Sequence, residues 1–187
     1  KVEDTKRLYE IIAAVKSLAQ ASLTGAGHST AVLRATSYSS PMAAFQDEMA
    51  GIGYYQFIEK LEKDFDQQKD LIVQELRKLM KMILRPENFM ISYTGERESL
   101  EEVKKLAAHI RQGLNTEPVE KSEKKLICTR KNEGFKTSGQ VQFVAQTGNF
   151  KKKGLEYTGA LDILKVILSY DYLWMNLRVK GGAYGCM

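Results

Sequence analysis

The chain has 187 residues, of which 43% are hydrophobic and 27% are charged, so wholesale disorder is excluded and one large or two small domains with a core are expected. The net charge of +5 comes from 28 basic and 23 acidic residues that are interspersed, which indicates a solvated surface and argues against a nucleic-acid partner. No apolar run reaches the length of a membrane span and no signal peptide is visible, so no membrane partner is expected.

The first 50 residues predict helices that flank one strand. Apolar residues recur at helical spacing over residues 8–18, and Gly25 breaks the pattern. Residues 29–38 alternate and are rich in Thr, Val and Tyr, which predicts a strand. Ser40 is a candidate N-cap and Pro41 suits a first helical position, so a helix is expected to begin there.

Two further helices and a short strand are predicted next. A long helix is expected over residues 66–84, ended by Pro86. Its inward-facing side chains are expected to be Leu76, Leu79, Met80 and Ile83. The apolar stretch 88–95 predicts a short strand, and a capping box of Ser99 and Glu102 predicts the start of another helix.

A polar, charged and proline-containing stretch at residues 115–125 is the best linker in the chain. Beyond it, residues 126–131 and 139–148 predict two strands. Apolar residues at helical spacing over 161–177 predict a largely buried helix. Helices mixed with a few strands, without strict alternation, favour an α+β fold, a two-layer sandwich with helices on one face of a mixed or antiparallel sheet.

The chain offers little catalytic chemistry of its own. His28 and His109 have no partner residues at metal-ligand spacing, so neither is expected to bind a metal and no metal site is predicted. Cys128 and Cys186 lie far apart, which suits a reducing compartment and predicts no disulfide framework. There is no nucleophile elbow, no P-loop and no dinucleotide fingerprint. No complete catalytic apparatus is therefore expected within this chain.

The stretch LRVKGGAYG contains the most informative residues. Arg178 offers five N–H donors and Tyr184 a phenolic O–H, and two converging donors suit a peptide carbonyl or the oxyanion formed from it. Gly181 and Gly182 would let the backbone turn sharply and let a substrate approach. The alternative is structural: Arg178 neutralises a helix C-terminus and Tyr184 is half-buried in a strand. On spacing alone this structural alternative is favoured.

A resemblance to a known family favours the substrate-binding role of Arg178 and Tyr184 over the structural one. LWMNLRVKGGAYG resembles the Arg/Tyr signature of the inverted-zincin metallopeptidases of the insulysin and pitrilysin type, in the version of the presequence-protease and falcilysin branch. LRATSYSSPMAAFQDEMAGIGYYQFIEKL, ENFMISYTGERESLEEV and GQVQFVAQTGNF resemble other segments of that branch, in the same order. The resemblance therefore covers essentially the whole chain.

The resemblance implies a clamshell enzyme of four α/β units with the LuxS/MPP-like metallohydrolase fold. Zinc is held by an H-x-x-E-H motif and a distant Glu in the first unit, and none of these ligands is present here. The implied role of Arg178 and Tyr184 is to hold the peptide and to stabilise the charge that develops when zinc-activated water attacks it. The chain is then expected to be an inactive, zinc-free fragment of the C-terminal half, partnered by the zinc-bearing N-terminal half and by peptide substrates.

This interpretation assigns residues 1–114 to the third unit, 115–125 to a linker and 126–187 to the truncated start of the fourth. The expected location is the cytoplasm of a bacterium, or an organelle of a eukaryote. Two alternatives are a catalytically silent relative that acts as a scaffold and a basic nucleic-acid-binding domain. The retained Arg/Tyr pair argues against the first, and the lack of clustered basic and aromatic residues argues against the second.

Overall fold

The computed structural model describes residues 2–119 and 125–186. The chain divides into two compact units, residues 1–146 and 147–187. The predicted linker at 115–125 lies in part outside the described residues, and the assignment of the chain to α/β units stays a prediction.

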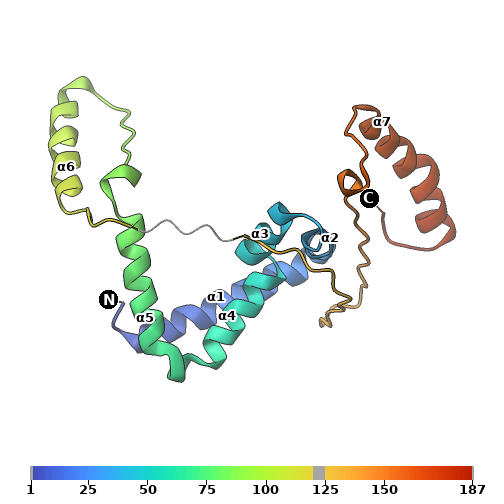
Figure 1. Cartoon of the computed structure of the whole chain (residues 1–187), viewed down its shortest axis with the longest axis horizontal. Helices are drawn as coiled ribbons and strands as arrows, with labels where there is room; N and C mark the ends of the chain where they lie inside the picture. Colours follow the sequence, from blue (N-terminus) through green and yellow to red (C-terminus); the bar gives the residue numbers. More distant parts are fainter. Residues whose placement is uncertain (1, 120–124, 187) are drawn as a thin grey trace. The chain divides into compact units, whose positions relative to one another are not determined.

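The packed part of the first unit is built from α1 (Thr5–Gly25), α2 (Gly27–Ser37), α3 (Pro41–Ala50) and α4 (Ile52–Lys63). Helix α1 packs beside α4, α2 beside α3, and α3 against α4 (Figure 1). The core between α1, α4 and the beginning of α5 (Phe65–Ile83) consists of buried residues and the partly buried ones around them: Ile12, Ile58 and Phe65, with Leu8, Val15, Tyr54, Leu61 and Ile72. These residues recur at steps of three and four, so each helix presents one apolar face to the other.

The first unit continues through α5 (Phe65–Ile83), the short 3₁₀ turns Pro86–Asn88 and Arg97–Ser99, and α6 (Leu100–Gln112). Side-chain amides complete the end of α5. The amide of Asn115 donates to the carbonyl of Lys81 at 3.0 Å, and that of Asn88 donates to the carbonyl of Ile83 at 3.0 Å. Because the last carbonyls of a helix have no partners within it, these two bonds stabilise the point at which α5 ends.

The second unit contains the 3₁₀ turn Phe150–Lys153, α7 (Ala160–Ile167) and the π-helix η4 (Leu168–Lys180). The predicted helix over 161–177 is confirmed, although its second half is wound with the wider π-type hydrogen bonding. Its predicted burial is not found, because the apolar side chains of α7 and η4 are largely exposed in the structure. No helix in the described part of the chain is long and apolar enough to cross a membrane.

The predicted α+β sandwich is wrong. Across residues 2–119 and 125–186 the structure is helical with irregular connections and contains no strand. Residues 29–38, predicted as a strand, lie mostly within α2, where the hydroxyls of Thr36 and Ser37 donate to carbonyls of their own helix at 2.8 and 2.7 Å. Strand propensity depends on packing against neighbouring strands, and α2 packs against α3 instead.

The other predicted strands, residues 88–95, 126–131 and 139–148, are irregular apart from 3₁₀ residues at the start of the first. A strand exists only where a second strand takes its backbone hydrogen bonds. In the described part of the chain these segments make no such ladder. Their alternating sequence is therefore present without the pairing that would form a sheet.

Candidate functional site

The turn that follows η4 needs both of its glycines. Gly182 has a φ of +72°, a conformation that favours glycine, and its N–H donates to the carbonyl of Arg178 at 3.0 Å. Ala183 donates to the carbonyl of Leu177 at 3.0 Å. At Gly181 a Cβ atom would lie 2.6 Å from the carbonyl oxygen of Leu177, so a side chain there would push the turn open.

This turn brings Arg178 and Tyr184 together. The guanidinium of Arg178 donates through Nη1 to the backbone carbonyl of Tyr184. Its central carbon lies 5.9 Å from the centroid of the Tyr184 ring. The guanidinium therefore faces the ring and the carbonyl of Tyr184, whose side chain is 91% exposed. Most of the guanidinium N–H groups and the phenol remain available to an acceptor from outside the chain.

Sequence reasoning missed Trp174 as a member of this site and placed it only on a helix face. The central carbon of the Arg178 guanidinium lies 4.6 Å from the centroid of a Trp174 ring, a cation–π contact. The signal available in the sequence was the spacing of four residues on one helix, which brings two side chains to the same face.

The described residues do not fit a zinc ion. Across residues 2–119 and 125–186 no group of three or more His, Cys, Asp or Glu side chains is arranged to hold a metal. The ring of His28 lies 6.2 Å from that of Phe143, and His109 lies in the last turn of α6. Cys128 and Cys186 are both free thiols.

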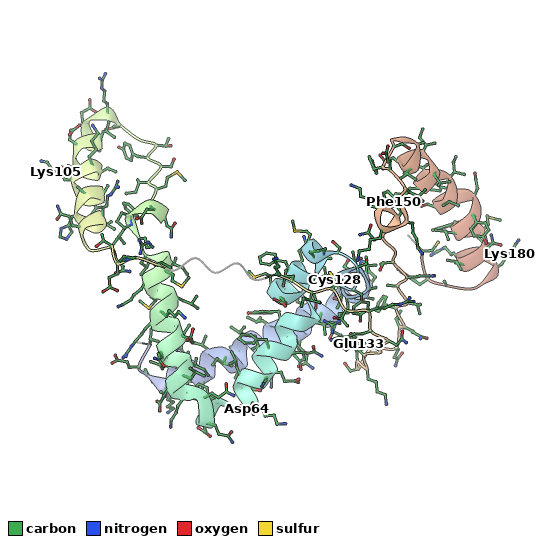
Figure 2. All side chains as sticks on the ribbon, in the orientation of Figure 1. Asp64, Lys105, Cys128, Glu133, Phe150 and Lys180 are labelled. Atoms are coloured by element: carbon green, nitrogen blue, oxygen red, sulfur yellow. The ribbon has the colours of Figure 1, made fainter. Side chains whose placement is uncertain are left out.

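A second polar cluster lies in the first unit around Arg34. Its Nη1 donates to Asp47 at 2.6 Å, and its Nε and Nη2 donate to the two carboxylate oxygens of Glu133 at 2.8 and 3.0 Å (Figure 2 labels Glu133). The hydrogen bonds from Arg34 lower the pKa of Glu133 to about 2, and the same bonds raise the pKa of Arg34. A hollow of about 610 Å³ borders Arg34 and Asp47. Since both carboxylates are held by one arginine, this cluster fastens the segment that contains Glu133 to α2 and α3.

Asp47 also caps α4. Its carboxylate accepts from the backbone N–H of Ile52 at 3.0 Å and from that of Gly53 at 3.2 Å. A Cβ atom at Gly51 would lie 2.4 Å from Asp47 Oδ1, so the carboxylate reaches these donors only because residue 51 has no side chain. A carboxylate at the start of a helix is also favoured by the helix dipole. The role of Asp47 is therefore structural.

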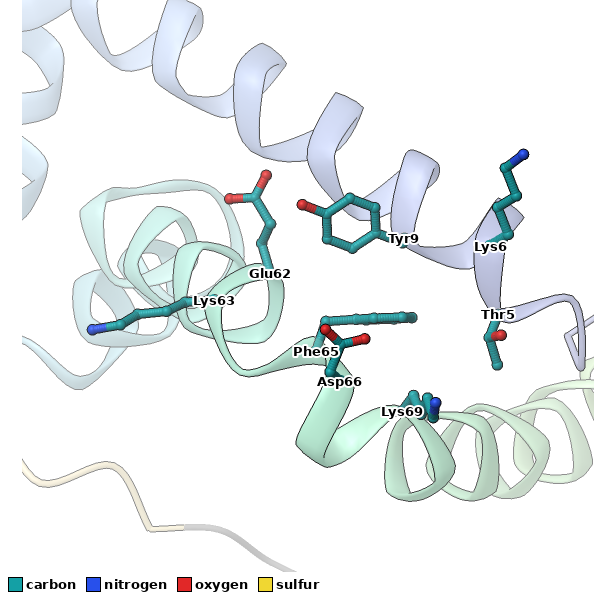
Figure 3. Close-up of a pocket in the computed structure, with 8 residues that line it drawn as sticks. All are labelled: Thr5, Lys6, Tyr9, Glu62, Lys63, Phe65, Asp66 and Lys69. Carbon is teal, nitrogen blue, oxygen red and sulfur yellow. The ribbon is translucent and has the colours of Figure 1, made fainter.

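A hollow of about 490 Å³ lies between the start of α1 and the junction of α4 with α5 (Figure 3). Tyr9 and Phe65 meet there edge to face, with ring centroids 5.3 Å apart. The side chains of Lys6 and Lys63 point away from this pair, and the lining residues include no histidine or cysteine (Figure 3). The hollow marks the rim of the core, and we assign it no chemistry.

Comparison with known proteins relates the chain to peptidases. A family model for the region associated with subfamily C of the M16 peptidases matches residues 1–61. The chain is 36% identical over 184 residues to Protein HypA of Clostridium perfringens (strain 13 / Type A), a match that covers 98% of this chain and 19% of HypA. It is 26% identical over 185 residues to Presequence protease 1, chloroplastic/mitochondrial, of Arabidopsis thaliana, covering 97% and 17% of the two chains.

A third relative is the mitochondrial Presequence protease of Yarrowia lipolytica (strain CLIB 122 / E 150), 28% identical over 191 residues, with 97% of this chain and 19% of the relative covered. The chain thus spans about a fifth of the length of the curated relatives it matches.

Proposed function

Because the chain belongs to the peptidase M16 family, in its presequence-protease branch, we propose that it forms part of a zinc metallopeptidase that degrades peptides. In this proposal Arg178 and Tyr184 bind the backbone of the substrate. They also stabilise the negative charge that develops on the scissile carbonyl.

The observation that carries the proposal is the juxtaposition of two donors on one glycine turn. Arg178 lies in the last turn of η4, the chain turns at Gly182, and Tyr184 lies beside the guanidinium. Donors held before the reaction stabilise a developing charge without reorganising, and this is the source of oxyanion stabilisation. The phenol of Tyr184 is exposed, so a peptide carbonyl can reach it.

The proposal limits this chain to binding the peptide and stabilising the developing charge. The described residues offer no cluster that fits zinc, so we propose that the zinc ligands lie in a part of the enzyme outside this chain, the zinc-bearing half, which would be its partner. On its own the chain is proposed to be inactive. We place it in the cytoplasm of a bacterium or in an organelle of a eukaryote, in line with a bacterial relative and with relatives named as chloroplastic or mitochondrial.

The decisive experiment is Tyr184→Phe in the longer peptidase that contains this segment. The substitution keeps the ring and removes the hydroxyl, so kcat should fall on the order of 10²–10³-fold while the melting temperature is unchanged. Tyr172→Phe is the matched control, because it makes the same chemical change at an exposed tyrosine of η4 and should leave kcat unchanged.

Peptide turnover would be measured with the zinc content confirmed for each protein. If Tyr184→Phe turned peptides over within about threefold of the parent, the donor role would be refuted. The alternative, a catalytically silent scaffold in which Arg178 only stabilises the turn, would then be favoured.

A further inference from the structure

Arg178 is held in place before any substrate arrives, and Trp174 supplies one of the contacts that hold it. The central carbon of the guanidinium lies 4.6 Å from the centroid of the Trp174 ring, over which it is placed, and its Nη1 donates to the carbonyl of Tyr184. An arginine side chain loses considerable rotamer freedom when it is fixed. Here the contacts of Arg178 with Trp174 and with the carbonyl of Tyr184 already restrict its rotamers before a peptide binds.

We infer that Trp174 is a positioning residue for Arg178 and that it acts on the peptide only through the guanidinium. The inference rests on the function proposed above and deepens it. Stacking occupies the face of the guanidinium plane and leaves the in-plane N–H groups free. The indole can therefore fix the arginine without competing with a peptide carbonyl for its donors.

The π-helical winding of η4 supports this role. Segments of π-helix are rare and are frequent at functional sites. Residues 174 and 178 both lie within the π-helix Leu168–Lys180 and meet at its C-terminal end, where the chain turns at Gly181. The side chain of Trp174 is 42% exposed, so its replacement removes a contact at the surface of the second unit.

The contact can be tested without any peptidase activity. Trp174 is the only tryptophan of the chain, so fluorescence excited at wavelengths that tyrosine does not absorb reports on it alone. Arg178→Gln should uncover the indole and raise its quenching by acrylamide about twofold. Lys180→Gln, the same change of charge two residues away, should not alter the quenching.

In nuclear magnetic resonance spectra the Nε–H of Arg178 should show an upfield ring-current shift that Trp174→Leu abolishes. A wild-type chain without this shift would overturn the inference.

The role is tested in the longer peptidase. Trp174→Leu should lower kcat/KM about tenfold, mainly through KM, whereas Trp174→Phe keeps an aromatic face and should stay within about threefold. In an Arg178→Gln background Trp174→Leu should have no further effect, because the residue through which it acts is already lost. An equal loss in both backgrounds would overturn the inference.

The two proposals fail in different ways. If Arg178→Gln and Tyr184→Phe both left turnover unchanged, the proposed function would be refuted while the fluorescence and ring-current signals would still report the contact. If those two variants were impaired and Trp174→Leu were not, the donor role would stand and the positioning role of Trp174 would be refuted.

Discussion

Replacing Asp47 with alanine should destabilise the first unit by about 3 kcal/mol. Asp47 is 4% exposed, and its carboxylate accepts from Arg34, Ile52 and Gly53. Loss of the two backbone bonds at the start of α4 removes a helix cap, which costs about 1 kcal/mol. Loss of the bond to the charged guanidinium adds about 2 kcal/mol.

The predicted destabilisation by Asp47→Ala is at the lower end of the roughly 3–5 kcal/mol expected when one partner of a buried ion pair is removed. The reason is that Glu133 keeps both of its hydrogen bonds to Arg34, so the guanidinium is not left without a carboxylate. Asp47→Asn keeps only one of the two oxygens. The amide oxygen can still accept from the N–H of Ile52, but the amide nitrogen replaces the oxygen that accepts from Arg34 and Gly53, so this variant should lose most of the about 3 kcal/mol.

The free energy of unfolding would be measured on the whole chain by urea denaturation, followed by the far-ultraviolet circular dichroism of its helices. Glu10→Ala is the control, because Glu10 pairs with Arg7 on an exposed face of α1 and its loss should cost under about 0.5 kcal/mol. In an Arg34→Met background, the loss from Asp47→Ala should shrink to the cap, about 1 kcal/mol. A loss from Asp47→Ala no larger than that from Glu10→Ala would refute this account.

Two further outcomes follow from the packing and charges of the first unit. Phe65→Ala should lower the free energy of unfolding by about 3–4 kcal/mol in the same urea assay, because Phe65 is 6% exposed and its ring contacts that of Tyr9. Phe57, which is 58% exposed, provides the control. Equal losses from Phe65→Ala and Phe57→Ala would contradict the described core. The pKa of Glu133 is lowered from 4.5 to about 2, so its contribution to stability is fully present above pH 4.5 and is lost as the pH falls through about 2. The carboxyl carbon shift of Glu133 should titrate near pH 2 in the wild-type chain and at a higher pH in Arg34→Met, and a wild-type midpoint near 4.5 would exclude the ion pair.

Local signals in the sequence predicted helices well. The start of α3 is confirmed at Ser40 and Pro41, where the hydroxyl of Ser40 accepts from the N–H of Ala43 at 3.4 Å. The helix before Pro86 is confirmed as α5, but its predicted inward face is wrong, because Leu79, Met80 and Ile83 are exposed. The helix predicted from Ser99 begins at Leu100, although the side chain of Ser99 makes no capping bond. Caps, prolines and apolar spacing act within a few residues, so they can be identified without knowledge of the fold.

Strands and distant contacts could not be predicted in this way. The alternation over residues 29–38 was compatible with a strand, but the pairing that decides between strand and helix depends on residues elsewhere in the chain. The same limit applies to the sites. The glycine turn between Arg178 and Tyr184 was evident from spacing, whereas no local pattern joins Arg34 to Glu133, which is 99 positions away.

That separation of 99 positions has a consequence for the order of folding. Closing a loop of this length costs about 4 kcal/mol of chain entropy, more than closing the short loops that join α2 to α3 and α3 to α4. The helices should therefore assemble first, within microseconds to milliseconds, and present Arg34 and Asp47 as a preformed half of the cluster. The segment with Glu133 docks last. In the mature protein it should also be the first part of this cluster to open, so that it exchanges its amide hydrogens while α2, α3 and α4 stay protected.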